Sequence, residues 1–272
     1  MTASPSGRVA GKRILITGAR RGMGRSHALR LAQEGADLIL VDICQSLPQI
    51  EYPLATEEDL AETVELVREL GPRCVSHIVD VRDDVALRKA VDDGVGELGG
   101  LDGAVANAGV LTVGPWNTTT LDDWRTVVDV NLIGTWNTCA AAIPHLLDQG
   151  GGSLVNISSA GAIKGFPLQH PYTAAKHGVV GLTLGLANEL AAQSVRVNSV
   201  HPTGCPTGMI PPSIGAVFSE ERPDLIPIFV NAMPTPAVEP VDVSNAVLYL
   251  LSDESRYVTG LQFKVDAGVT IN

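Results

Sequence analysis

Short apolar runs alternate along the chain with segments whose apolar residues recur at helical spacing. The runs occupy residues 13–17, 38–41, 75–79, 101–106, 152–157, 195–200 and 260–266. Runs of this length between helices are typical of buried parallel strands. Helical spacing is clear through Leu60, Val64 and Val67, and again over 121–131, 172–192 and 241–251. The pattern predicts an α/β fold with about seven parallel strands and helices on both faces.

No internal repeat, linker or shift in composition divides the chain. We therefore expect a single Rossmann-type doubly wound domain over residues 1–272. Residues 1–12 contain Ser, Gly and Pro and no apolar stretch, so they are expected to be a short flexible lead.

Three glycines follow the first predicted strand, in Gly18-Ala19-Arg20-Arg21-Gly22-Met23-Gly24, and a helical segment follows them. Glycine permits a tight turn and lets backbone amides approach a phosphate at a helix N-terminus. A plain glycine-rich turn has the same composition, but the strand before it and the helix after it favour a βαβ unit that binds a dinucleotide.

Asp42 ends the second predicted strand, where a carboxylate can accept hydrogen bonds from the adenosine ribose hydroxyls. It would repel a 2′-phosphate, so we expect NAD rather than NADP. A guanidinium of Arg20 or Arg21 can pair with such a phosphate. We expect both arginines to face solvent and Asp42 to decide the preference.

Two further strand ends point to the same crevice. Asp80-Val81 follows the third strand, and the Asp80 carboxylate can accept from an adenine amino group or cap the next helix. Asn107-Ala108-Gly109 follows the fourth strand, and its small residues would let the backbone lie against a flat ring. Ligands of open α/β sheets gather at this edge.

Tyr172 and Lys176 are four residues apart, so on a helix they lie on one face. An ammonium close to a phenol favours the phenolate, so we expect Lys176 to lower the pKa of Tyr172. Ser158 and Ser159 end the fifth strand and face the same crevice. Asn131 lies among apolar residues, where its amide either bonds the local backbone or supports a polar site.

Two long loops border the predicted crevice. Residues 44–55 form an insertion after the second strand, which is either a tolerated surface loop or a flap over the cofactor's edge. Residues 205–238 are rich in proline and irregular, with scattered apolar side chains. We interpret this second loop as a lid over a hydrophobic substrate.

The remaining composition excludes several classes of protein. A net charge of −11 disfavours binding to nucleic acid or to an anionic membrane, and no apolar run approaches the ~20 residues that span a bilayer. The four cysteines are scattered and have no zinc-ligand spacing, so we expect no metal site and reduced thiols in the cytoplasm. Gly178, Gly181 and Gly185 suggest a closely packed helix and an oligomer.

The whole chain resembles the short-chain dehydrogenase/reductases. The resemblance rests on Thr17-Gly18-x-x-x-Gly22-x-Gly24, Asn107-Ala108-Gly109, and the order of Asn131, Ser159, Tyr172 and Lys176. It implies that Tyr172 transfers a proton, Ser159 holds the substrate oxygen, Lys176 binds the nicotinamide ribose and lowers the Tyr172 pKa, and Asn131 anchors a water. The cofactor contacts it implies are Gly18, Arg20, Arg21, Gly22, Met23, Gly24, Asp42, Ile43, Asp80, Val81, Asn107, Ala108, Gly109, Tyr172, Lys176, Pro202, Thr203 and Gly204.

Four segments carry a narrower resemblance, to the mycofactocin-coupled branch with its carveol dehydrogenase-like members. They are Gly24–His27, the insertion from Val41 to Thr56, Ala174–Leu182 and Asn198–Gly204. Met23 departs from the glutamine common in that branch, and the lid does not match closely. This resemblance implies interconversion of a secondary alcohol and its ketone on an apolar, terpenoid-like skeleton, with NAD that stays bound and is recycled by the redox carrier mycofactocin. The glycine- and alanine-rich helix from Tyr172 favours an oligomer, and we expect a homotetramer.

Three alternatives stay open from the sequence. An NADPH-dependent 3-ketoacyl or carbonyl reductase is the nearest, and Asp42 and the insertion argue against it. A non-catalytic nucleotide-binding regulator on the same fold is disfavoured by the intact set of Asn131, Ser159, Tyr172 and Lys176. A dehydratase or epimerase would need a larger C-terminal substrate domain than 272 residues leave.

Overall fold

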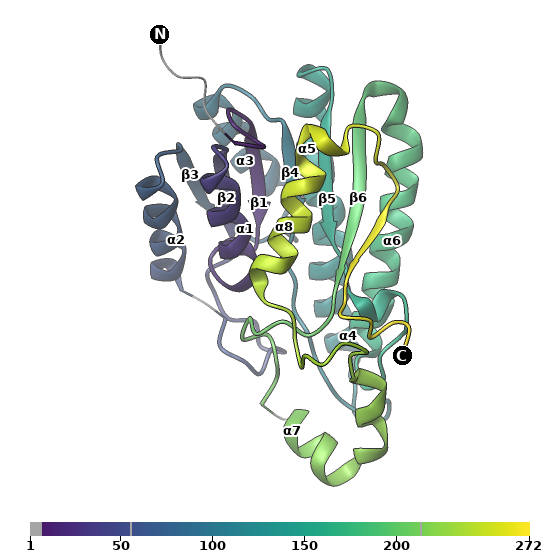
Figure 1. Ribbon diagram of the computed structural model, residues 1–272. Coiled ribbons are helices and arrows are strands. Elements are labelled where there is room, and N and C mark those ends of the chain that lie inside the picture. The colour runs from purple at the N-terminus through teal and green to yellow at the C-terminus, as the bar shows by residue number, and fades with distance from the viewer. Residues whose placement is uncertain (1–6, 55, 213) are drawn as a thin grey trace.

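The computed structural model describes residues 7–54, 56–212 and 214–272, and a single parallel sheet forms its centre (Figure 1). Seven strands lie in the order β3-β2-β1-β4-β5-β6-β7. Their bounds are β1 Arg13–Thr17, β2 Asp37–Asp42, β3 Cys74–Ile78, β4 Gly103–Ala106, β5 Gly152–Ile157, β6 Val195–Pro202 and β7 Gln262–Val265. Every pair in the sheet is parallel. The predicted doubly wound α/β fold is confirmed.

Helices cover both faces of the sheet. The longer ones are α1 Gly22–Gln33, α2 Glu57–Glu69, α3 Asp84–Leu98, α4 Leu121–Val128, α5 Gly134–Asp148, α6 His170–Leu190 and α8 Pro240–Leu251. Short helices are η1 Asp129–Ile133, η2 Ala160–Ala162, η3 Ala191–Gln193, α7 Ile214–Ala216, η4 Val217–Glu221, η5 Pro223–Phe229 and η6 Asp253–Ser255.

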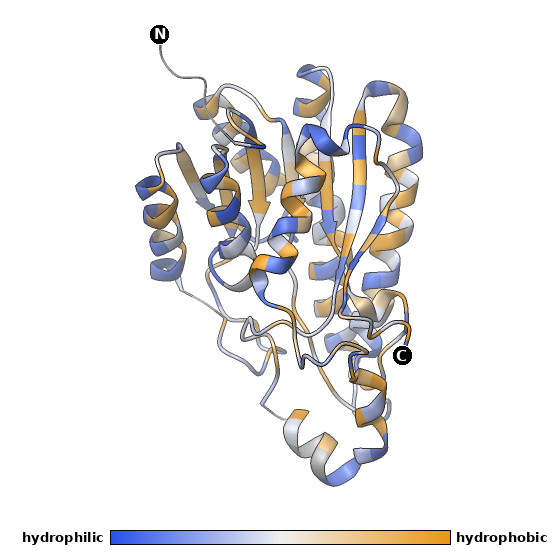
Figure 2. Cartoon of the chain, in the orientation of Figure 1, coloured by the Kyte–Doolittle hydropathy of each residue, from blue (hydrophilic) through white to orange (hydrophobic). Residues whose placement is uncertain are grey.

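Alternate residues of each central strand enter one of two cores, because successive side chains of a strand point to opposite faces. Leu15 packs in the core beneath α3, α5 and α6. Its neighbours Ile14 and Ile16 pack in the other core, beneath α1 and α8. Apolar residues therefore run continuously along the central strands (Figure 2).

The order in which strands are added to the sheet reverses between β1 and β4. The strands β1, β2 and β3 step outward on one side, and the chain then returns to place β4 beside β1, with Ile14 opposite Gly103. Loops leaving adjacent strand ends in opposite directions open a crevice at such a switch point. The glycine turn after β1 and the Asn107 segment after β4 meet there.

Two segments outside the strands and long helices, the N-terminal lead and the lid, differ from what the sequence predicts. Residues 1–6 of the expected flexible lead lie outside the described residues, but residues 7–12 are fixed, because Val9 is buried and the Arg8 amide donates to Glu34 at 2.9 Å. The lid contains the helical segments α7, η4 and η5, so it is more regular than its prolines indicate.

The insertion over 44–54 has no regular element but packs inward, since Leu47 and Tyr52 are buried in the core. All four cysteines are free thiols. Within the described residues, no helix is both long and apolar enough to span a membrane, and no three His, Cys, Asp or Glu side chains gather as metal ligands.

Candidate active site

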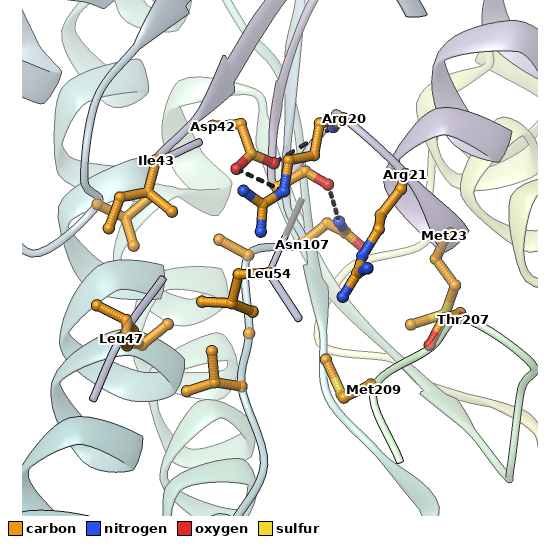
Figure 3. Close-up of a pocket in the computed structure, with 18 of the residues that line it drawn as sticks. Arg20, Arg21, Met23, Asp42, Ile43, Leu47, Leu54, Asn107, Thr207 and Met209 are labelled. Carbon is orange, nitrogen blue, oxygen red and sulfur yellow. Dashed lines mark hydrogen bonds and ion pairs between the residues drawn. The ribbon is translucent and has the colours of Figure 1, made fainter. Parts of the chain in front are cut away.

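A pocket of about 800 Å³, including its open mouth, occupies the switch-point crevice (Figure 3). Thirteen of the predicted cofactor residues line it: Gly18, Arg20, Arg21, Gly22, Met23, Gly24, Asp42, Ile43, Asp80, Val81, Asn107, Ala108 and Gly109. The other five, Tyr172, Lys176, Pro202, Thr203 and Gly204, are not among its lining residues.

The glycine turn is held by backbone contacts that leave no room for side chains. A Cβ on Gly24 would lie 1.9 Å from the Gly18 carbonyl oxygen, and one on Gly18 would lie 2.8 Å from Ala108 Cα. Gly18 also has φ +68°, which favours glycine. The turn brings the N-terminus of α1 to the pocket, and its N-cap residue Arg21 makes no side-chain cap. The first amides of α1 are thus a fitting cradle for a pyrophosphate.

Asp42 and Arg20 form a buried ion pair in the pocket wall. Arg20 Nε lies 3.1 Å from Asp42 Oδ1, and the two side chains are 7% and 5% exposed. The amides of Arg20 and Cys44 also donate to this carboxylate, each at 3.3 Å. Burial raises the pKa of the Asp42 carboxyl, while the Arg20 charge opposes that rise. The expectation that Arg20 faces solvent is wrong, because a buried carboxylate draws the nearest cation to itself.

The Asp80 carboxylate pairs with Arg82 and does not cap helix α3. Its carboxylate accepts from the amide and from Nε of Arg82, at 2.9 and 2.8 Å. The residue that caps α3 is Asp83, whose side chain accepts from the Ala86 amide. The helix-cap alternative for Asp80 is therefore wrong, and its carboxylate stays at the pocket wall.

Asn107 has an unpaired acceptor in the crevice. Its Nδ2 donates to the carbonyl oxygens of Thr17 and Gly18, at 3.1 and 3.0 Å. These two acceptors fix the amide orientation, which leaves the buried Oδ1 without a partner. A buried acceptor without a partner is costly in a folded protein, and Asn107 lines the pocket. Oδ1 is placed to receive a donor from a bound nucleotide.

Ser159, Tyr172 and Lys176 meet at the carboxyl end of β5. Tyr172 hydrogen-bonds the Ser159 side chain, and Ser159 Oγ also accepts from the Gly161 amide at 3.0 Å. Lys176 Nζ donates to the Ile157 carbonyl at 2.8 Å and lies 5.6 Å from the centroid of the Tyr172 ring. The predicted i, i+4 pair therefore shares one face of α6 with the serine opposite.

The pKa of Tyr172 does not follow the sequence expectation. Burial raises it above its ordinary value, and the Ser159 hydrogen bond only partly opposes the rise. Burial also lowers the pKa of Lys176 to about 7, because a buried ammonium loses its hydration. The expected lowering of the Tyr172 pKa is wrong for the chain alone, since desolvation outweighs the Ser159 hydrogen bond.

Asn131 lies in the π-helix η1 between α4 and α5 and is fully buried. Its Nδ2 donates to the carbonyls of Val110 and Val127, both at 2.8 Å, and its Oδ1 accepts from the Val110 amide at 3.3 Å. The sequence left two roles open for the Asn131 amide, and the structure shows the first of them, hydrogen bonding to the local backbone. Asn131 Oδ1 and Lys176 Nζ both border Gly109, at 2.7 and 3.7 Å from the position of an added Cβ.

Thr203 belongs to the base of the lid. Its amide donates to the Val265 carbonyl at 3.2 Å, and its Oγ1 donates to Asn231 Oδ1 at 2.9 Å. Pro202 ends β6 just before it. Residues 202–204 therefore anchor the lid in this structure, and cofactor contact by them stays a prediction.

Known proteins share this architecture over almost the whole chain. A family model described as enoyl-(acyl carrier protein) reductase matches residues 18–270. The (−)-trans-carveol dehydrogenase of Rhodococcus erythropolis is 47% identical, over 97% of this chain and 99% of that protein. The crystal structure of carveol dehydrogenase from Mycobacterium avium in complex with NAD is 48% identical, with a TM-score of 0.93, and covers 98% of this chain and 100% of that one. A short chain dehydrogenase from Mycobacterium paratuberculosis bound to NAD is 45% identical, with a TM-score of 0.95 and the same coverage.

The chain is a short-chain dehydrogenase/reductase. In this family member, eight pocket residues lie outside the set predicted from the sequence: Leu47, Tyr52, Leu54, Val79, Val110, Val130, Thr207 and Met209. The first three come from the insertion and the last two from the lid. Tyr52 Oη accepts from the Leu111 amide at 2.9 Å. Nothing in the sequence indicates that Tyr52 makes this contact, because a single tyrosine in a loop has no characteristic spacing. Only the unusual length of the loop pointed to a possible role for the segment.

Proposed function

We propose that this short-chain dehydrogenase/reductase is an NAD-dependent oxidoreductase that interconverts a secondary alcohol and its ketone. The observation that carries the proposal is the hydrogen bond between Tyr172 and Ser159, with Lys176 beside them at the strand-end crevice. Two hydroxyls and a cation at one point suit an oxygen that changes between hydroxyl and carbonyl.

The residues of the crevice fit a dinucleotide. The Gly18–Gly24 turn presents the first amides of α1, which no side chain caps, to the pyrophosphate, and Asn107 Oδ1 offers an unused acceptor. Asp42 and Asp80 would hold the adenosine half, and Lys176 the nicotinamide ribose. When bound, NAD supplies the hydride acceptor for alcohol oxidation.

The chain's own residues handle the proton. In oxidation the Tyr172 phenolate accepts the proton of the substrate hydroxyl, and in reduction the Tyr172 hydroxyl returns it to the ketone oxygen. The Ser159 hydroxyl donates to the same oxygen and holds it in place. When protonated, Lys176 stabilises the phenolate through its charge. Asn131 fixes the backbone of Val110 and Val127 and would anchor a water near Lys176.

An apolar, ring-shaped substrate of the terpenoid kind fits the lid side of the site. Three of the chain's four phenylalanines gather there. The rings of Phe166 and Phe229 are 4.8 Å apart, and those of Phe218 and Phe229 are 5.0 Å apart. A methyl group added at Gly161 would lie 3.3 Å from Phe166 and 3.4 Å from Ser159 Oγ, so the cluster borders the serine. The carveol dehydrogenase activity named for the Rhodococcus relative agrees with this substrate class.

Retention of NAD and its recycling by mycofactocin form the finer part of the proposal. Leu47, Tyr52 and Leu54 bring the insertion to the pocket wall, and the Tyr52–Leu111 bond ties it to the loop after β4. An insertion fastened in this way would slow nucleotide release. NAD that cannot leave must be reoxidised in place by a redox carrier.

A homotetramer in the cytoplasm completes the proposal. Trp124, Ile133, Trp136 and Leu184 are 37–44% exposed on α4, η1, α5 and α6. Large apolar side chains gathered on neighbouring helices favour contact with another copy of the chain. The cytoplasmic location rests on the four unpaired cysteines.

The experiment purifies the protein without added cofactor and identifies bound nucleotide by mass spectrometry after denaturation. An alcohol panel with an artificial electron acceptor then tests the reaction. We expect roughly stoichiometric NAD and turnover of cyclic secondary alcohols. Faster turnover of a ketoacyl thioester with NADPH would favour the 3-ketoacyl reductase instead.

Tyr52→Phe tests retention, because the variant loses one hydrogen bond and keeps the ring. Loss of a neutral hydrogen bond costs about 1 kcal/mol, so bound NAD should exchange with labelled NAD about fivefold faster. An empty wild-type preparation that regains activity on simple NAD titration would contradict retention and leave the dehydrogenase activity standing.

A further inference from the structure

His201 is a fully buried histidine next to Ser159 that has no part in the proposed proton transfer. It belongs to β6, where Val197, Ser199 and His201 share one face because alternate residues of a strand point the same way. Val197 packs in the core beneath α6, so the imidazole lies on the side of the sheet that α6 covers. A buried polar ring needs hydrogen-bond partners, and both ring nitrogens of His201 have one.

The two partners of His201 assign its tautomer. Nδ1 lies 3.0 Å from the Ser159 carbonyl oxygen, and Nε2 lies 2.8 Å from Ser199 Oγ. Because a carbonyl oxygen only accepts, Nδ1 carries the hydrogen and donates it. Burial lowers the pKa of the His201 ring, which keeps it neutral at pH 7. Nε2 is then an acceptor, and the Ser199 hydroxyl donates to it.

This histidine joins β5 and β6 just beyond the end of β5. The pairing of the two strands reaches Ser158, whose amide donates to the Val200 carbonyl at 2.8 Å. One residue further on, the Ser159 carbonyl accepts from the His201 side chain. The same carbonyl accepts from the Ala162 amide at 2.9 Å, but that bond lies within the turn at η2 and can move with it. His201 therefore ties Ser159 to the sheet.

We infer that His201 is a positioning residue, which sets the place of the Ser159 hydroxyl relative to Tyr172. Ser159 Oγ accepts from the Gly161 amide at 3.0 Å and hydrogen-bonds Tyr172, so a shift of the Ser159 main chain moves it with respect to the phenol. A substrate oxygen has to meet both hydroxyls at once, and a misplacement of about 1 Å costs about a hundredfold in rate. The inference rests on the proposed interconversion of alcohol and ketone, and adds a residue that acts through Ser159.

Three variants separate the donor from the bulk of the ring. His201→Leu removes both hydrogen bonds and fills a similar space. His201→Asn keeps a donor, because the asparagine Nδ2 occupies the place of the imidazole Nδ1 while the bond to Ser199 is lost. His27→Leu is the control, since His27 is also fully buried and its Nδ1 lies 2.8 Å from Ser244 Oγ. It lies on α1, against the opposite face of the sheet.

Single-turnover reduction of NAD on the loaded protein by a cyclic secondary alcohol gives the maximal rate and the half-saturating alcohol concentration of each variant. We expect a fall of about a hundredfold in the maximal rate of His201→Leu, with half-saturation within about threefold of wild type and unchanged bound NAD. His201→Asn should stay within about tenfold of the wild-type rate, and His27→Leu within about threefold. A wild-type rate in His201→Leu overturns the inference. Equal losses in His201→Leu and either of the other two variants do so as well.

Crystal structures of wild type, His201→Leu and His201→Asn give a readout that needs no turnover. Ser159 Oγ should move about 1 Å relative to Tyr172 Oη in the leucine variant and stay in place in the asparagine variant. An unmoved Ser159 in His201→Leu overturns the inference and leaves the alcohol–ketone reaction standing. Wild type that turns over no alcohol contradicts the proposed reaction, and the position of Ser159 then decides the inference alone. If His201→Leu does not fold, His201→Gln replaces it, because its longer side chain places the amide near Nε2 and leaves Ser159 without this donor.

Discussion

The glycine turn and the lid border the same crevice but are held by different kinds of contact. In the turn, backbone atoms contact backbone atoms. A Cβ added at Gly24 would lie 1.9 Å from the Gly18 carbonyl oxygen. The lid is held at its base by single bonds, such as Thr203 to Asn231 and the Met233 amide to the Ala267 carbonyl. Further out, the Phe229 ring of η5 meets both Phe166 and Phe218 of η4.

This difference separates the two tasks of the site. Backbone sterics allow one arrangement of the turn and one kind of ligand, a phosphate held by amides. Side-chain packing in the lid can be exchanged without disturbing the sheet, so the lid can adapt to different substrates. A substitution in the turn should therefore affect folding and nucleotide together, and one in the lid should affect substrate alone.

Gly24→Ala is expected to have the largest effect. Its methyl group would overlap the Gly18 carbonyl, so the turn must shift, at a cost of about 3 kcal/mol. Bound nucleotide should be lost, as measured by mass spectrometry, and the free energy of unfolding should fall in urea titration. Gly96→Ala in α3 is the control, because nothing lies within 4 Å and helix propensity predicts a gain of about 1 kcal/mol. Equal effects of the two changes would contradict the steric account.

Lys176→Met tests the buried ammonium beside Tyr172. The Lys176 pKa falls from 10.5 to about 7 on folding, so between these pH values the unfolded chain holds one more proton than the folded chain. Lys176 should therefore add to the free energy of unfolding of nucleotide-free wild type as the pH rises from 7 to 10, by up to about 1.4 kcal/mol per unit. The four thiols, whose pKa is raised by burial, oppose this rise above pH 9 in wild type and variant alike. The variant should lack this rise and gain most stability at pH 7 and below.

Urea unfolding from pH 6 to 10 measures the rise. Lys89→Met is the control, because Lys89 is exposed on α3, and it should keep the wild-type slope. The same slope in Lys176→Met would show that Lys176 stays protonated in the fold.

Phe229→Leu is expected to have the smallest effect, and to act on substrate alone. The change removes the ring that contacts both Phe166 and Phe218. KM for a cyclic secondary alcohol should rise about tenfold, while KM for a linear alcohol and the bound nucleotide stay unchanged. Phe263→Leu is the control, because Phe263 packs on Tyr249, 6.2 Å away between ring centroids. Equal changes for cyclic and linear alcohols would remove the aromatic cluster from substrate selection.

The nucleotide side was largely predictable from the sequence. Gly18, Gly22 and Gly24 are visible as a spacing because no other residue fits their contacts, and strand ends place Asp42, Asp80 and Asn107 at one edge. The proximity of Tyr172 and Lys176 was predictable for a similar reason, since i, i+4 residues share a helix face.

The features of the site that could not be predicted from the sequence depend on which side chains are buried. The pairing of Arg20 with Asp42 and the raised pKa of Tyr172 both follow from removal of water, which residue spacing does not report. The pocket contacts of Tyr52 and Met209 depend on how two loops fold over the crevice. Loops without periodicity carry little information about their path.

Tyr172→Phe tests the central claim, that Tyr172 carries the substrate proton, most directly. The variant keeps the ring beside Lys176 and loses only the hydroxyl that bonds Ser159. The measurement is the reduction of bound nicotinamide in a single turnover after mixing with a cyclic alcohol, alongside Tyr249→Phe as control. The account predicts a loss of about a thousandfold in rate with unchanged nucleotide content. A rate within tenfold of wild type would contradict it.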